Sequence, residues 1–180
     1  MTAHELLSPA GNMEKLRAAI LYGADAVYLA GRSFGMRSAA DNFSVEELAQ
    51  AADFVHARGK KLYLTVNTMP HEQEYPALRE FLLAVRGIRI DALIVADLGV
   101  LALCRELLPD VELHISTQAS VVSSAAARAY AALGARRLVL ARELTLREIE
   151  MIREGLSPEV ELEVFIHGSM CVSYSGRCLL

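Results

Sequence analysis

Short apolar runs alternate with longer amphipathic segments along most of this chain. Examples of the runs are Ala26–Leu29, Lys61–Val66 and Ala92–Val95. After each run, apolar residues recur at the three- to four-residue spacing of a helix that buries one face. The pattern therefore predicts strands and helices in regular alternation, seven strands and six helices in all. The predicted strands are Glu5–Ser8, Ala26–Leu29, Lys61–Val66, Ala92–Val95, Leu113–Ser116, Arg137–Leu140 and residues 161–166.

Capping residues mark where several of the helices begin. Ser44–Glu47 and Thr145–Glu148 have the form of capping boxes, and Asn12 and Asp97 stand where N-caps are expected. A further helix is predicted over residues 71–86. The polar residues at these boundaries support the predicted order of elements.

Near-continuous apolar strands that alternate with helices indicate a parallel sheet covered on both faces. An open dinucleotide-binding sheet would need Gly-x-Gly-x-x-Gly after the first strand, but the sequence there is Ser-Pro-Ala-Gly-Asn. The α/β fold expected is therefore a (β/α)8 barrel like that of triosephosphate isomerase. Such a barrel takes about 250 residues, so we expect residues 1–180 to be its N-terminal part, without the eighth strand.

Barrel enzymes carry their chemistry at the carboxyl ends of the strands. The polar residues predicted there are Ser8, Asn67, Ser116, Thr117, Gln118, Arg142, Glu143 and His167. Each of them could instead only cap the following helix, although Gln118, Arg142, Glu143 and His167 are poor N-caps. We expect Ser8, Asn67, Gln118 and Arg142 to bind substrate and Glu143 and His167 to be catalytic, with Arg37 and Arg177 as weaker binding candidates. The planar guanidinium of Arg142 suits a ligand carboxylate.

Two cysteines lie close to the end of the chain, with six residues between Cys171 and Cys178. This spacing excludes the Cys-x-x-Cys arrangement of zinc ribbons and thioredoxin-like sites. It suits a loop around a larger group such as an iron–sulfur cluster, which takes four thiolates. The alternative is a pair of unrelated buried thiols. Cys104 falls within a helical apolar pattern and is expected in the core.

The same segment resembles the signature of peptidase family U32, the collagenase-like proteases. The matching stretches are Glu163-x-Phe165-x-His167-Gly-Ser-Met-Cys171 and Tyr174–Leu179. Residues 5–11 and 23–28 resemble the opening of the same family. The resemblance thus covers essentially the whole chain and independently implies a barrel.

The resemblance implies RNA hydroxylation rather than proteolysis. Family members of the most similar branch convert the wobble uridine of tRNA to 5-hydroxyuridine with prephenate, and others modify 23S ribosomal RNA or serve oxygen-independent ubiquinone hydroxylation. Such proteins hold a 4Fe-4S cluster on four cysteines. Cys171 and Cys178 match the first two of these ligands, and the other two are expected after residue 180. The implied partners are tRNA and a small anionic cosubstrate, with a homo- or hetero-oligomer left open.

Two other functions stay open. A peptidase of the common metal-dependent kind would need His-Glu-x-x-His, which none of the five histidines provides. A serine or cysteine peptidase would use Ser169 or Cys171 beside His167. The third possibility is a cluster-bearing partner protein without catalysis of its own, as in ubiquinone hydroxylation.

Composition agrees with a globular, cytoplasmic protein. The chain is 53% hydrophobic, which is enough for a sizeable core. No apolar run reaches membrane-spanning length, and the N-terminus lacks the basic and apolar regions of a signal peptide. Three cysteines, an odd number, argue against a disulfide framework. The net charge of -4 shows no basic footprint, so composition by itself does not indicate RNA binding.

Overall fold

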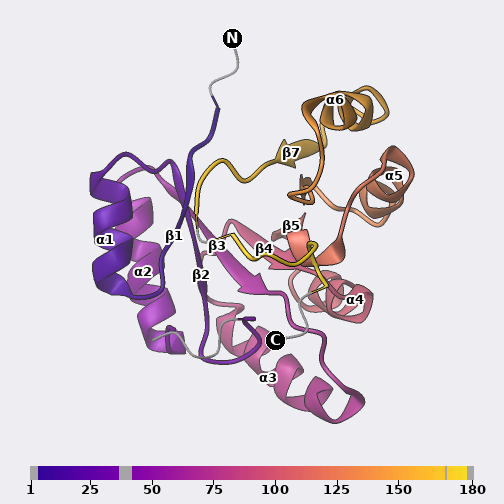
Figure 1. The fold of residues 1–180 in the computed structure, drawn as a ribbon. Coiled ribbons are helices and arrows are strands. Elements are labelled where there is room, and N and C mark those ends of the chain that lie inside the picture. The colour runs from indigo at the N-terminus through magenta and orange to yellow at the C-terminus, as the bar shows by residue number, and fades with distance from the viewer. Residues whose placement is uncertain (1–3, 37–41, 169, 178–180) are drawn as a thin grey trace.

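The computed structural model describes residues 4–36, 42–168 and 170–177. They form a parallel sheet of seven strands in the order β1-β2-β3-β4-β5-β6-β7, with six α-helices between the strands. The sheet curls so that the helices lie on its outer side (Figure 1). Neighbouring strands follow one another in sequence, which is the topology of a barrel rather than of an open doubly wound sheet. The predicted fold class is confirmed.

The elements have the following bounds. The strands are β1 (Leu7–Pro9), β2 (Ala26–Ala30), β3 (Lys61–Val66), β4 (Ala92–Val95), β5 (Glu112–Ile115), β6 (Arg137–Val139) and β7 (Glu161–Glu163). The α-helices are α1 (Met13–Leu21), α2 (Val45–His56), α3 (Tyr75–Val85), α4 (Leu98–Leu107), α5 (Ser124–Ala132) and α6 (Leu146–Glu154). Short 3-10 helices, η1 (Glu72–Glu74) and η2 (Thr117–Ala119), precede α3 and follow β5.

The predicted caps are confirmed. Asn12 accepts a hydrogen bond from the Lys15 N–H at 2.9 Å, and Asp97 accepts one from the Val100 N–H at 3.0 Å. The capping boxes at the starts of α2 and α6 are both complete. These contacts satisfy N–H groups that the first helical turn leaves unpaired.

Two predicted boundaries are wrong by more than two residues. The last strand was expected to continue to residue 166, but β7 ends at Glu163, and Ile166 is 81% exposed. The reason lies in the neighbouring strand, because β6 ends at Val139, which pairs with Glu163. Likewise, α3 begins at Tyr75 and not at residue 71, after the turn of η1.

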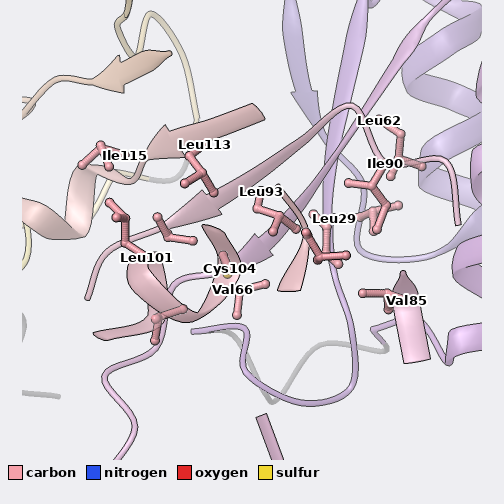
Figure 2. Close-up of a cluster of buried hydrophobic side chains, with 14 of the residues drawn as sticks. Leu29, Leu62, Val66, Val85, Ile90, Leu93, Leu101, Cys104, Leu113 and Ile115 are labelled. Carbon is pink, nitrogen blue, oxygen red and sulfur yellow. The ribbon is translucent and has the colours of Figure 1, made fainter. Parts of the chain in front are cut away.

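The outer face of the sheet packs against the helices to form the main core. Figure 2 shows Val66, Leu93 and Leu113 from the strands meeting Leu101 and Cys104 from α4. Cys104 is fully buried, as predicted, and burial raises the pKa of its thiol to about 12. Helix packing on this face fixes the positions of the strands, and the strands in turn fix the positions of the residues at their carboxyl ends.

The inner face of the sheet is partly polar and is organised around Arg137. Its Nη1 lies 2.7 Å from Glu5 Oε1 and 3.4 Å from Glu163 Oε2, and its Nε donates to Glu161 Oε2 at 2.8 Å. The Tyr63 hydroxyl donates to Glu5 at 2.7 Å. We call Glu5, Tyr63, Arg137, Glu161 and Glu163 the arginine cluster. It links the segment before β1 to β3, β6 and β7.

The arginine cluster changes the ionisation of its members. Burial opposes the ionisation of Glu5, but hydrogen bonds from Arg137 and Tyr63 outweigh burial and lower its pKa to about 2. Beside the cluster, the ring of His114 is completely buried and packs edge to face against the ring of Tyr63, with 4.8 Å between the two ring centroids. Burial, reinforced by the charge of Arg137, lowers the pKa of His114 to about 3, so this ring is neutral at pH 7.

None of the helices within residues 4–36, 42–168 and 170–177 is long and apolar enough to cross a membrane.

Candidate functional site

A cavity of about 390 Å³ opens on the inner side of the curled sheet, where several strands end. Asn67, Ser116 and Gln118 contribute amides and a hydroxyl from the segments after β3 and β5. Lys15 of α1 and Glu163 of β7 add one side chain of each charge. The apolar part of the lining includes Tyr28, Ile94, Val139 and Phe165. A pocket with apolar walls and a few polar groups suits a small organic ligand.

Hydrogen bonds fix the amide of Asn67 at the edge of this cavity. Its Nδ2 donates to Ser116 Oγ at 3.3 Å, and its Oδ1 accepts from the Met36 N–H at 3.2 Å. Ser116 Oγ also accepts from the Gln118 N–H at 3.3 Å, which caps η2. The ends of β3 and β5 and the loop after β2 are thereby joined through one polar network.

A second polar group lies after β6 and holds residues 170–177, which we call the Cys171 segment. The guanidinium of Arg142 donates to the Cys171 carbonyl at 2.6 Å, to the Ser173 carbonyl at 2.7 Å and to Ser175 Oγ at 3.2 Å. The carboxylate of Glu143 accepts from Ser175 Oγ at 3.0 Å and from the Ser175 N–H at 3.2 Å. We call Arg142, Glu143 and Ser175 the loop clamp. Ser175, at its centre, is only 1% exposed.

The Cys171 segment rests directly on η2. The Ser120 hydroxyl donates to the Ser175 carbonyl. Gly176 has a φ of +70°, and a Cβ atom there would lie 2.1 Å from the Gln118 carbonyl oxygen. A side chain at position 176 would therefore be strained and would also collide with η2. Because Gln118 also lines the cavity, the Cys171 segment and the cavity share one wall.

The predicted site residues divide between these two places. Asn67 and Gln118 line the cavity, whereas Arg142 and Glu143 form the loop clamp. Ser8 does not line the cavity, because it pairs with Val27 in a row that faces the helices. Neither does His167, which is exposed after β7. The roles predicted for these residues stay predictions.

Three of the predicted or weaker candidates, Arg37, Ser169 and Cys178, lie outside the described residues. Conversely, both charged residues of the cavity lining, Lys15 and Glu163, were missed. Glu163 belongs to the family signature, and this membership was the available signal. Lys15 carried no signal, because a lysine in the first turn of a helix is ordinarily solvated.

The described residues supply a thiol donor for an iron–sulfur group. Cys171 is exposed on the clamped segment, and a thiolate is the ligand that cluster iron requires. Cys104 is unsuited, because its sulfur is buried in the core far from water. No group of three or more His, Cys, Asp or Glu side chains within the described part of the chain could hold a metal ion. Cys171 is thus one fitting ligand of the four that a cluster takes.

A family comparison fits this arrangement. The model of "Peptidase family U32" matches residues 11–180. The chain belongs to peptidase family U32. This U32 chain is 44% identical over 176 residues to the tRNA hydroxylation protein P1 of Bacillus subtilis (strain 168), and the match covers 98% of the chain and 41% of that protein. It is 40% identical over 176 residues to the 23S rRNA 5-hydroxycytidine C2501 synthase of Escherichia coli (strain K12), with 98% of the chain and 26% of that enzyme covered.

The chain therefore spans less than half the length of these relatives. Among solved structures, the U32 peptidase Mk0906 superposes with a TM-score of 0.75 at 19% identity, which covers 91% of this chain and 69% of that one. At that identity the similarity establishes the U32 barrel fold and not an activity.

Proposed function

We propose that this chain is the barrel part of an enzyme that hydroxylates RNA. In its more specific form, the proposal is prephenate-dependent conversion of the tRNA wobble uridine to 5-hydroxyuridine. The observation that carries it is the shared wall between the cavity and the Cys171 segment, formed by Gln118. The names of relatives that match 98% of the chain support hydroxylation of RNA as the reaction.

The cavity residues have the chemistry to bind a small polar ligand. The amides of Asn67 and Gln118 offer both donors and acceptors, and Lys15 offers positive charge to an anionic cosubstrate. The guanidinium of Arg142 is engaged with carbonyls of the Cys171 segment. This contact supports a role in holding the segment, while the pairing of Arg142 with a ligand carboxylate stays a prediction.

We propose a 4Fe-4S cluster as the resident cofactor, with Cys171 and Cys178 as two of its ligands. A bound cluster of this kind supplies one-electron redox chemistry. The loop clamp would hold the backbone at Cys171 and just after it, because the carbonyls of Cys171 and Ser173 both accept from Arg142. His167 precedes Cys171 by four residues and is a candidate for proton transfer at the same segment.

Metal analysis tests the cofactor directly. The intact protein, purified without oxygen, is expected to contain about four iron and four sulfide per chain, as a cubane cluster requires. Cys171→Ala should lose them. Cys104→Ala is the matched control and should keep them, since the Cys104 thiol is buried in the core. A wild type that folds but holds no iron would reject the cofactor.

Nucleoside analysis tests the reaction. Cells that lack the protein are expected to lose one hydroxylated nucleoside from tRNA or ribosomal RNA, and wild type but not Cys171→Ala should restore it. The nucleoside that disappears identifies the substrate. An unchanged nucleoside profile would reject RNA hydroxylation.

Peptide hydrolysis is the alternative that the name of the structurally similar Mk0906 suggests. It needs an accessible nucleophile beside a base. Ser175 is unsuitable, because it is buried and its hydroxyl is bonded within the loop clamp. Cys171 and His167 are exposed and therefore accessible to a peptide. Cleavage of denatured collagen by the wild type, with loss of cleavage in Cys171→Ala, would favour the peptidase function.

A further inference from the structure

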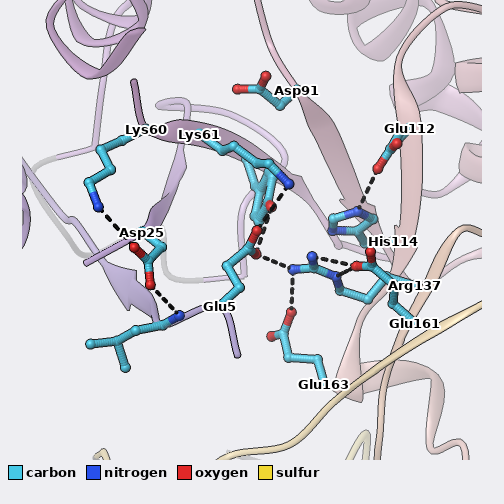
Figure 3. Close-up of polar contacts among 12 residues, drawn as sticks. Glu5, Asp25, Lys60, Lys61, Asp91, Glu112, His114, Arg137, Glu161 and Glu163 are labelled. Atoms are coloured by element: carbon cyan, nitrogen blue, oxygen red, sulfur yellow. Dashed lines mark hydrogen bonds and ion pairs between the residues drawn. The ribbon is translucent and has the colours of Figure 1, made fainter. Parts of the chain in front are cut away.

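Glu163 stands between the cavity and the arginine cluster. It is the last residue of β7, its side chain lines the cavity, and its Oε2 lies 3.4 Å from Arg137 Nη1 (Figure 3). The side chain is only 20% exposed. The Leu140 N–H donates to the Glu163 carbonyl at 2.9 Å, so β6 fixes its backbone. The proposed function has not used this carboxyl group.

The charges around Glu163 do not balance when every carboxylate is ionised. One guanidinium faces three carboxylates, and Glu5 and Glu161 hold the two short contacts, at 2.7 and 2.8 Å. Lys61 adds a positive charge to Glu5 at 3.1 Å, and Figure 3 shows it on the side of Glu5 away from Glu163. Glu163 has the longest contact of the three, so it is the member that gains most from binding a proton.

Burial strengthens this preference. It raises the pKa of Glu163, the charge and hydrogen bond of Arg137 offset the increase only in part, and the negative charges of Glu5 and Glu161 add to it. Lys15 of α1 is the other charged side chain that lines the cavity within the described residues. A neutral carboxyl group in a cavity wall can donate a hydrogen bond, which an ionised one cannot.

We propose that Glu163 is an acid–base residue of this cavity, and that its protonated carboxyl donates a hydrogen bond to a neutral oxygen or nitrogen acceptor of the bound ligand. An anionic group at this place would face the remaining carboxylates of the arginine cluster and be repelled. The anionic part of the ligand would instead lie toward Lys15. The ligand class is therefore a small compound with a keto or hydroxyl oxygen separate from its negative charge.

The proton transfer changes no oxidation state, so it needs no oxidant or reductant. When the acceptor atom gains negative charge, the proton passes from the carboxyl of Glu163 to that atom. The carboxylate left behind lies next to Arg137, whose positive charge stabilises it. The cavity opening returns a proton from solvent after product leaves. The inference rests on the proposed function in placing the ligand in this cavity.

A ligand-free measurement tests the ionisation. In the intact protein labelled with ¹³C at the glutamate carboxyls, the signal absent from Glu163→Gln is expected to titrate above the ordinary glutamate value near 4.3. Glu161→Gln is the matched control, since Glu161 contacts the same Arg137 but does not line the cavity. It should keep the Glu163 signal, with a pKa somewhat lower than in wild type because one nearby negative charge is removed. A Glu163 signal that titrates at or below the ordinary value would overturn the proposal.

Binding of prephenate, used as the probe, tests the role in the cavity. Affinity of wild type and of Glu161→Gln is expected to fall up to tenfold per pH unit above the pKa of Glu163, while Glu163→Gln should bind with a flat profile. A flat wild-type profile, or no binding, would overturn the inference. Normal pH-dependent binding without any hydroxylated nucleoside in RNA would instead reject the proposed function and leave the role of Glu163 in place.

Discussion

Arg137 begins β6, Arg142 lies three residues after its last residue, and the two arginines hold two different kinds of structure. Arg137 is 6% exposed and joins carboxylates from the chain before β1 and from β7 inside the curled sheet. Arg142 donates to backbone carbonyls of a segment that is mostly exposed apart from the buried Ser175. The first arginine ties the two edges of the sheet together, whereas the second positions a loop. Substitutions should therefore affect global stability at Arg137 and local order at Arg142.

The largest effect is expected from Arg137→Ala. This variant leaves Glu5, Glu161 and Glu163 without their shared cation, and removing one partner of a buried ion pair costs about 3–5 kcal/mol. Urea unfolding followed by circular dichroism measures the loss. Arg136→Ala, at the exposed neighbouring position, is the control and should change stability by about 0.5 kcal/mol or less. Equal losses of unfolding free energy at positions 136 and 137 would show that the arginine cluster does not stabilise the fold.

Acid should weaken the same region. The folded-state pKa values of His114, about 3, and Glu5, about 2, both lie below their ordinary values, so the unfolded chain binds these protons first. Stability is then expected to fall as pH drops from about 6.5, through His114, and further below about 4.5, through Glu5. The loss between pH 6.5 and 4 should be roughly 3–4 kcal/mol, most of it from His114. Urea unfolding at several pH values measures it, and His114→Gln should flatten the upper part of the curve.

Arg142→Ala is expected to leave global stability within about 1 kcal/mol of wild type and to release the Cys171 segment. A charge-assisted hydrogen bond is worth about 2 kcal/mol, which corresponds to roughly 30-fold more frequent local opening. The measurement is the rate of chymotrypsin cleavage after Tyr174, a residue that is 71% exposed. Gly176→Ala should have the same effect, because its Cβ would collide with Gln118.

A control in the same segment sharpens this test. Arg177 is exposed, so Arg177→Ala should leave cleavage after Tyr174 unchanged. If Arg142→Ala and Arg177→Ala were cleaved at the wild-type rate alike, the loop clamp would have no role in ordering the segment.

The smallest effect is expected at a surface ion pair far from β6. Arg79 and Glu106 lie 2.8 Å apart, with side chains 49% and 59% exposed. Solvent screens such a pair, so Arg79→Ala should cost about 0.5 kcal/mol or less. A double-mutant cycle with Glu106→Ala measures the coupling. A coupling as large as the loss in Arg137→Ala would contradict the importance assigned to burial.

Local patterns predicted most of the elements well. The first six strands were placed within two residues of their observed ends, and Asn12, Asp97 and both capping boxes were identified correctly. The last strand was extended too far, because apolar alternation continues to Ile166 although β6 ends earlier and offers no further partner. Alternation indicates that a segment is able to form a strand. The length of the neighbouring strand decides how many of its residues are paired.

The candidate site was less predictable than the fold. Position after a strand correctly brought Asn67 and Gln118 to the cavity, but it could not separate them from Arg142 and Glu143, which turn toward the C-terminal segment. Glu163 was passed over as a residue of the strand. Its significance comes from Arg137 and Glu5, and the latter two residues are 132 positions apart.

The sequence by itself determined the order of strands and helices and the parallel barrel topology, because periodicity and capping act over a few neighbouring residues. Only the tertiary structure decided that three carboxylates share one guanidinium, that Gly176 rests against Gln118, and that the cavity and the Cys171 segment have a common wall. These contacts join residues far apart in the chain. Their energies depend on burial and on the direction of side chains, which exist only once the sheet has curled.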